Sequence, residues 1–216
     1  MIWSWSAIEV WQICPEQFAH KYVWKDLTKM PKTPEQQKGI DLHELYDKST
    51  TARQPISPLQ ASVLKAAEGK ELVTELHLAI DANLKPIGYW SQEGWGRGII
   101  DVGLIGARAA WLGDWKTGKT KEKPGQLEIF ALFGFVHWPQ VQEISTCNLW
   151  IKTGKTGTIR TFRRDEVPHL LAGIIKPVNE IERAVEANAF PRRPGPLCGW
   201  CDATMCPLNP LNPRKP

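Results

Sequence analysis

The sequence lacks an apolar run near the roughly 20 residues that a membrane-spanning helix requires. Its N-terminus lacks the basic-then-apolar pattern of a secretory signal, so we expect a cytoplasmic protein. The Gly-Lys-Thr at residues 154–156 lacks the earlier glycine of a nucleotide-binding phosphate loop, and no segment of the sequence repeats. These absences argue against a membrane protein, a secreted protein and a nucleotide hydrolase built on that loop.

Charge of one sign is also scarce, because 27 basic residues are balanced by 23 acidic ones and leave a net charge of +4. This mild excess permits an anionic partner without requiring one. Hydrophobic residues make up 42% of the 216 residues and charged residues 23%, which are ordinary values for a globular chain long enough to bury a core. The eleven tryptophans supply large rings for core packing or for stacking on nucleic-acid bases.

The expected elements follow the order helices, strands, a helix, a hairpin and a closing helix. Ser6 and Glu9 have the spacing of a capping box, and Pro15 suits the first turn of a second short helix. Sequence patterns predict helices over 38–48, 58–68, 125–138 and 166–188, the last interrupted near Pro177, and strands over 71–80, 97–105, 109–117, 145–153 and 158–163. This order predicts an α/β domain with a central mixed sheet flanked by helices.

We expect residues 1–216 to form a single domain with four parts. A helical part covers residues 1–70, a sheet with an inserted helix covers 71–164, and a closing helix covers 165–189. Residues 190–216 form a proline-rich tail without clear periodicity, which we expect to pack on the N-terminal part.

Three of the five cysteines lie close together in this tail, at Cys198, Cys201 and Cys206. In a cytoplasmic protein such spacing indicates a metal site rather than disulfides. Cys14, beside Pro15 at a helix junction, is the natural fourth ligand and would staple the tail to the N-terminal part. Four thiolates suit either a zinc ion or an iron–sulfur cluster. Cys147 lies in an apolar strand pattern and is expected to be a small buried residue.

Two carboxylates and a lysine stand at the ends of the glycine-punctuated apolar strands, at Asp101, Asp114 and Lys116. Mg²⁺ is commonly held by one or two carboxylates together with a substrate phosphate. Lys116 lies two residues after Asp114, so both side chains would project from the same face of a strand. The spacing therefore predicts a metal-dependent phosphodiesterase site. The basic residues that follow, Lys119, Lys121 and Lys123, are expected to contact a nucleic-acid backbone.

An ordered series of residues resembles the PD-(D/E)XK nuclease superfamily, specifically its RecB-type exonuclease branch. The series comprises Gly39 through His43, Glu75, Gly98 through Asp101, Asp114 through Gly118, and Gln126. The N-terminal Cys-Pro pair and the C-terminal cysteine trio are similar to those of CRISPR-associated RecB-like nucleases and AddAB-type nuclease domains. The resemblance implies a restriction-endonuclease-like core and a four-iron, four-sulfur cluster held by Cys14, Cys198, Cys201 and Cys206.

The resemblance also implies roles at the phosphodiesterase site. It makes Lys116 the catalytic lysine and implies Mg²⁺ or Mn²⁺ ligation by His43, Asp101, Asp114 and the main-chain carbonyl of Trp115. Gln126 matches the first position of the branch's Gln-x-x-x-Tyr motif, but Phe130 stands where the tyrosine is usual, so a role for that hydroxyl is absent. Glu75 is expected either in an outer shell of the metal site or in an ion pair.

We therefore expect a metal-dependent DNA exonuclease that acts on single strands or DNA ends in recombination, repair or replication. A helicase, an annealing protein or an integrase would be its partner, and its compartment would be the host cytoplasm if a phage encodes it. One alternative is a nucleic-acid-binding or partner-docking module that keeps the fold and cuts little. Another is a structure-specific endonuclease with the same chemistry.

Overall fold

The computed structural model describes residues 2–27 and 32–209, and the chain separates into two compact units. The larger unit contains residues Thr33–Ala172, and the smaller contains Trp3–Lys32 together with the segment from Gly173 onward. In the described part of the chain, no helix has both the length and the apolar character needed to cross a membrane.

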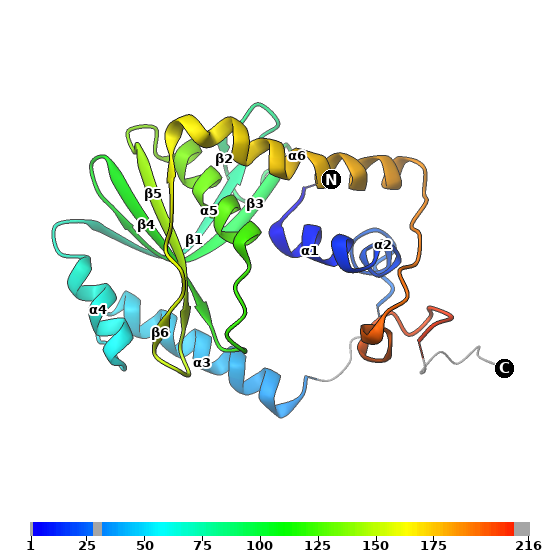
Figure 1. The fold of residues 1–216 in the computed structure, drawn as a ribbon, viewed down its shortest axis with the longest axis horizontal. Helices are drawn as coiled ribbons and strands as arrows, with labels where there is room; N and C mark the ends of the chain where they lie inside the picture. Colours follow the sequence, from blue (N-terminus) through cyan, green and yellow to red (C-terminus); the bar gives the residue numbers. More distant parts are fainter. Residues whose placement is uncertain (1, 28–31, 210–216) are drawn as a thin grey trace. The chain divides into compact units, whose positions relative to one another are not determined.

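The larger unit is built around a mixed seven-stranded sheet (Figure 1). The strands lie in the order β2-β1-β3-β4-β5-β6, and β7 also pairs with β5. Their bounds are β1 Glu71–Ile80, β2 Pro86–Ile87, β3 Gly96–Ile105, β4 Ala109–Lys116, β5 Glu143–Trp150, β6 Lys155–Thr156 and β7 Arg160–Arg163. Strands β1, β3 and β4 pair antiparallel, whereas β4 and β5 pair parallel because the helix α5 (Pro124–His137) returns the chain between them.

Helices cover both faces of this sheet. Trp115 of β4 stacks edge-on against Tyr46 of α3 (Pro34–Thr51), with the ring centroids 5.3 Å apart. The preceding residue, Asp114, contacts Gln126 of α5. Because consecutive strand residues point to opposite faces, α3 and α5 lie on opposite sides of β4. The structure thus confirms the expected α/β class with a mixed sheet flanked by helices.

The face toward α3 carries a continuous apolar core that also includes α4 (Pro58–Ala66). Its buried members are Tyr46, Leu59, Val63, Val102, Trp115, Cys147, Leu149 and Ile151. Cys147 is fully buried here, as its apolar strand pattern predicted. Burial of this cluster stabilises the end of β4, where the candidate site begins.

The smaller unit begins with α1 (Trp5–Ile13), α2 (Pro15–Phe18) and the π-helical turn η1 (Ala19–Val23). Pro15 occupies the first turn of α2 as predicted. The capping box predicted at Ser6 and Glu9 is wrong, because the helix begins earlier and Ser4 is its N-cap. The Ser4 side chain accepts a hydrogen bond from the Ala7 backbone N–H. Ser4 and Ser6 are both suitable N-cap residues, and the structure has Ser4 in that position.

Helix α6 (Val167–Glu186) is one continuous helix, so the predicted interruption at Pro177 is wrong. A proline costs one intrahelical hydrogen bond and crowds the carbonyl four residues earlier. Leu170, Ile174, Val178 and Ile181 are nevertheless buried at helical spacing along one face. Packing of this apolar face offsets the proline penalty and the helix continues through it. After α6, the tail contains the short 3₁₀ turn η3 (Pro196–Trp200), and residues 210–216 of the predicted tail lie outside the described residues.

Candidate metal-dependent active site

The candidate site lies where the central strands stop pairing with one another. The β3–β4 ladder runs from Ile105–Ala110 to Val102–Gly113 and ends immediately before Asp101 and Asp114. The freed backbone N–H of Trp115 donates a 2.7 Å hydrogen bond to Oδ2 of Asp101. The opening of the ladder therefore fixes one carboxylate of the site through the backbone of the neighbouring strand.

His43 of α3 connects Asp101 to Glu75 of β1. Its Nε2 lies 3.1 Å from Oδ2 of Asp101 and its Nδ1 lies 3.8 Å from Oε1 of Glu75. Within the described residues, these three side chains form one group whose ligand atoms lie within 4.8 Å of one another. An imidazole nitrogen and two carboxylates this close suit a divalent cation such as Mn²⁺ or Mg²⁺.

Glu75 has an unusual backbone for a strand residue. Its φ is 44°, in the left-handed region, and the β1–β3 ladder passes from Thr74–Val102 to Leu76–Ile100 without pairing Glu75 with Asp101. A non-glycine residue held there costs on the order of 1–3 kcal/mol. Such strain is typical of functional positions, and here it accompanies a carboxylate that lies beside His43. The structure therefore places the Glu75 carboxylate within ion-pair distance of His43 and among the side chains that could hold a metal ion.

Asp114, Lys116 and Gln126 form a closed triangle beside this group. Nζ of Lys116 lies 2.5 Å from Oδ2 of Asp114 and donates a 3.0 Å hydrogen bond to Oε1 of Gln126. Nε2 of Gln126 in turn donates a 2.8 Å bond to Oδ1 of Asp114. Gln126 lies in the first turn of α5, so the sequence-predicted amide is held against both the carboxylate and the lysine.

The electrostatics of the site arise mainly from burial. Desolvation raises the pKa of the Asp114 carboxyl to about 7, with the charge of Asp101 adding to the effect and Lys116 opposing it. The hydrogen bond that the His43 ring donates to Asp101 raises the pKa of His43, and burial raises the pKa of Glu75. Neighbouring buried carboxyl groups resist ionisation, and a cation between them stabilises their ionised form. This set of donor atoms therefore fits a divalent metal ion.

The remaining predicted residues occupy the strands and loop around the site. The ring of Trp115 is buried in the α3 face, and ligation by its carbonyl stays a prediction. Phe130 is buried in α5, which is consistent with a packing role in the absence of a hydroxyl. Lys119 and Lys121 are exposed and Lys123 is half-buried, all in the segment that leads from β4 to α5. Their contact with a nucleic acid stays a prediction.

Two polar residues near the site escaped the sequence analysis. Asn148 of β5 is paired in register with Asp114 and is buried, yet neither of its side-chain amide atoms has a hydrogen-bond partner among the described residues. Asp47 lies one helical turn after His43, and burial raises the pKa of its carboxyl. Two sequence signals would have revealed these residues: Asn148 is a lone asparagine in an apolar strand, and Asp47 follows His43 by four residues.

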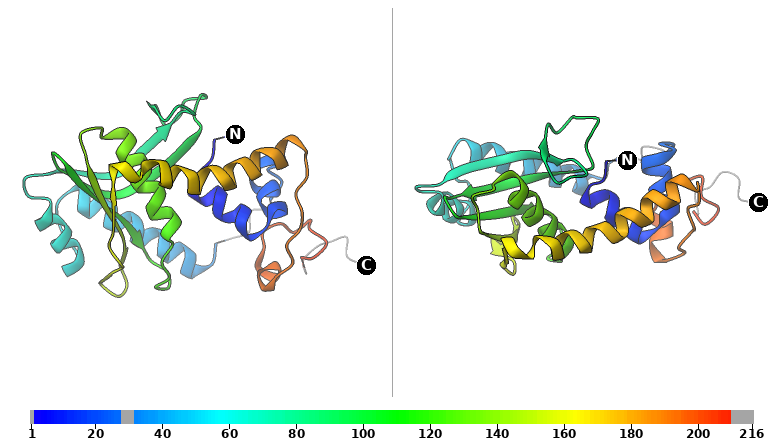
Figure 2. Two further views of the ribbon diagram at one scale, coloured as in Figure 1. Left: turned by 45° about the horizontal axis from the view of Figure 1, so that its top comes forward. Right: turned by 90° about the horizontal axis from the view of Figure 1, so that it is seen from above.

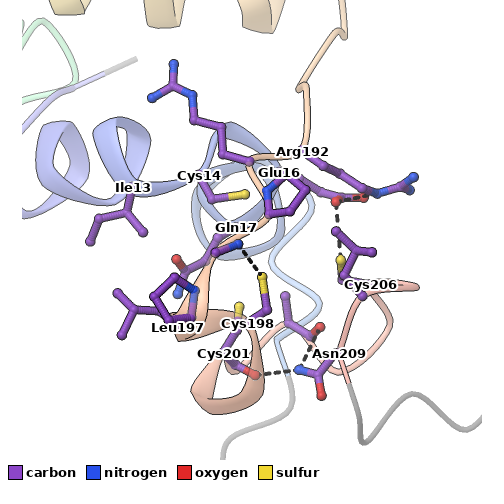
Figure 3. Close-up of a pocket in the computed structure, with 16 residues that line it drawn as sticks. Ile13, Cys14, Glu16, Gln17, Arg192, Leu197, Cys198, Cys201, Cys206 and Asn209 are labelled. Atoms are coloured by element: carbon purple, nitrogen blue, oxygen red, sulfur yellow. Dashed lines mark hydrogen bonds and ion pairs between the residues drawn. The ribbon is translucent and has the colours of Figure 1, made fainter.

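The four clustered cysteines belong to the smaller unit and line one cavity of about 240 Å³ (Figure 3). Cys14 lies at the junction of α1 and α2, as predicted, and Cys198 lies in η3. Burial raises the pKa of the Cys201 thiol, with smaller contributions from Cys14 and Cys206. The Cys206 thiol lies 3.4 Å from Oε2 of Glu16. The structure thus places cysteines from both ends of the sequence around a common space.

No protein-family model matches the sequence, and no curated protein matches it. The crystal structure of SSO0001 is similar with 13% identity and a TM-score of 0.47, covering 94% of this chain and 85% of that one. The crystal structure of LHK-Exo in complex with dAMP is similar with 13% identity and a TM-score of 0.48, covering 86% of this chain and 88% of that one. Because these values are low, the functional proposal rests on the site itself.

Proposed function

We propose that the chain is a metal-dependent nuclease that hydrolyses phosphodiester bonds of DNA, acting as an exonuclease on single strands or ends. The observation that carries the proposal is the set of His43, Glu75 and Asp101, with their ligand atoms within 4.8 Å, beside the Asp114–Lys116 pair. A strained glutamate, a broken ladder and buried carboxylates all occur at this one place. Such a combination costs stability and is typical of a functional site.

In this proposal His43, Glu75, Asp101 and Asp114 hold Mg²⁺ or Mn²⁺. The bound cation would lower the pKa of a water molecule and polarise the phosphate. Lys116 then positions the attacking water by a hydrogen bond from Nζ and offsets the negative charge that develops on the phosphate. Gln126 acts as a positioning residue, because its amide fixes the Lys116 ammonium on one side and Asp114 on the other.

The basic segment after β4 supports a polyanionic substrate. Lys119 and Lys121 are exposed a few residues beyond Lys116, so their ammonium groups can contact phosphates of a strand bound at the site. Binding through such contacts releases cations that are condensed on the DNA. This release becomes less favourable as the salt concentration of the solution rises, so binding weakens.

The cavity lined by the four cysteines supports a structural iron–sulfur cluster held by Cys14, Cys198, Cys201 and Cys206. All four cysteines are in the described part of the chain, and there no three of their sulfurs lie within 4.8 Å of one another. Tetrahedral zinc, with Zn–S bonds of about 2.3 Å, needs sulfurs about 3.8 Å apart. The wider arrangement around a cavity of about 240 Å³ suits a larger group. Equal amounts of iron and acid-labile sulfide, lost in Cys201→Ser and retained in Cys147→Ala, would support the cluster, whereas stoichiometric zinc would contradict it.

Digestion of end-labelled DNA tests the proposed activity. Purified wild type should cut DNA with Mn²⁺ or Mg²⁺ and not in EDTA, whereas Lys116→Met should lose at least about 100-fold in rate, as expected for the loss of an electrostatic stabiliser. Lys65→Met removes an exposed lysine from α4 and is the matched control with an unchanged rate. Release of mononucleotides from an end supports an exonuclease, and internal cuts support an endonuclease. A folded wild type that cuts no DNA with either metal would overturn the proposal in favour of a binding module.

A further inference from the structure

An aromatic corner is formed by residues of β1, of β3 and of the segment between β2 and β3, and β1 and β3 also carry the candidate ligands Glu75 and Asp101. His77 of β1 stacks on Tyr89, with the ring centroids 4.5 Å apart and the planes 22° apart. Trp90 stands nearly perpendicular to both rings, at 4.9 Å from Tyr89 and 6.5 Å from His77. The guanidinium carbon of Arg97 lies 5.5 Å from the centroid of Tyr89. We call these four residues the aromatic corner.

The aromatic corner is open to solvent. Trp90 is 75% exposed, although a tryptophan that served only to anchor its loop would be expected to bury its ring. Tyr89 and Trp90 belong to the segment between β2 and β3, which extends beyond the sheet in Figure 2. The stacked rings of His77 and Tyr89 therefore support the Trp90 ring, whose surface is accessible to a ligand.

The strands place the aromatic corner close to the proposed cleavage site. His77 follows Glu75 by two residues on β1, so their Cα atoms are separated by at most about 7 Å. Arg97 precedes Asp101 by four residues on the neighbouring strand β3, a separation of at most about 13 Å. These distances suit the nucleotides next to a phosphodiester bond held at the metal ligands.

We propose that the aromatic corner is a base-stacking subsite for single-stranded DNA, in which Trp90 stacks on an unpaired base and Arg97 contacts the adjoining phosphate. An unpaired base can reach the exposed ring, whereas both faces of a base within a duplex are already covered by its neighbours. Stacking on aromatic side chains is tolerant of sequence because every base has a π-face, and a guanidinium beside the rings adds a cation for the backbone. This inference rests on the proposed nuclease function and names the strand state of its substrate.

Binding in EDTA tests the subsite separately from cleavage. Replacement of Trp90 by Leu should weaken binding of a short single-stranded oligonucleotide by about 5- to 150-fold, the range for loss of one stacked base, and Trp90→Phe should retain most of the affinity. An abasic strand of the same length is the matched ligand, and its affinity should be the same for wild type and Trp90→Leu. Circular dichroism should show that both variants fold as wild type does.

The outcomes separate the two proposals. Equal affinity of wild type and Trp90→Leu for the normal strand would overturn the subsite, as would an equal loss on the abasic strand, which would indicate a general effect on the backbone contacts. Metal-dependent cleavage of the abasic strand by wild type reports on the chemistry alone, because this strand keeps the phosphodiester bonds and lacks the bases. Stacking of DNA on Trp90 without cleavage of any phosphodiester would uphold the subsite and overturn the nuclease.

Discussion

Replacement of Asp114 by asparagine should stabilise the metal-free protein above neutral pH. Burial raises the pKa of this carboxyl from 3.8 to about 7, a difference that corresponds to about 4 kcal/mol between its two protonation states. The folded state keeps the proton at pH values where the unfolded chain has already lost it. The contribution of Asp114 to stability therefore falls as pH rises from about 4 to about 7, and the full cost is present above about 7.

Urea unfolding in EDTA at pH 5.5 and pH 8 measures this cost. Asp114→Asn should be more stable than wild type at pH 8 by up to about 4 kcal/mol, and the gain should be smaller at pH 5.5, because wild type is then protonated. Added Mn²⁺ should make wild type the more stable of the two proteins. A metal ion that binds the folded state stabilises that state, and Asp114→Asn binds Mn²⁺ less well than wild type does. Asp41→Asn, the same substitution at an exposed position of α3, is the matched control.

A wild type that equals or exceeds Asp114→Asn in stability at pH 8 without metal would refute the reasoning. That result would mean that the Lys116 ammonium already compensates the buried charge, so that Asp114 would be part of a structural ion pair rather than a carboxylate held for a cation.

Three further predictions concern other parts of the larger unit. Gln126→Leu should lower the cleavage rate by about 10- to 100-fold with little change in substrate affinity, because Lys116 loses the amide that positions it. Steady-state kinetics measures both quantities, and a rise in KM with an unchanged kcat would contradict this prediction. Arg164→Ala should reduce the free energy of unfolding by about 3 kcal/mol, since the guanidinium donates to three backbone carbonyls at and beyond the end of α5; a change below 1 kcal/mol in urea unfolding would contradict this. Burial raises the pKa of the Cys147 thiol to about 12, so iodoacetamide should leave it unmodified in the native protein and modify it in urea, as peptide mass spectrometry can establish.

The sequence predicted the elements that depend on local patterns. Strand β1 has the predicted bounds, and β3 and β4 differ from prediction by one residue, because alternating or glycine-punctuated apolar runs determine them. Helix α3 is longer than predicted at both ends, since a capping box at Thr33 and Gln36 starts it before the apolar pattern begins. The cap at Ser4 and the intact α6 differ from prediction because each depends on competition between nearby residues or on tertiary packing.

The candidate site was predictable in its residue types and less so in its geometry. Spacing on one strand was sufficient to pair Asp114 with Lys116, and the resemblance supplied His43 and Gln126. The position of Glu75 depends on a left-handed backbone inside a strand, which alternation alone does not predict. Asn148 joins the site only through the parallel register of β4 and β5, a long-range pairing that no local pattern specifies.

The most direct test of the central claim is single-turnover cleavage of an end-labelled single strand, measured as a function of Mn²⁺ concentration in wild type and in Asp101→Asn. Asp101 accepts hydrogen bonds from both His43 and the Trp115 backbone, so loss of its charge removes a ligand at the centre of the site. The account predicts that cleavage by wild type rises as Mn²⁺ binds, and that Asp101→Asn loses both Mn²⁺ binding and cleavage. Cleavage in EDTA, or undiminished Mn²⁺-dependent cleavage by folded Asp101→Asn, would contradict it.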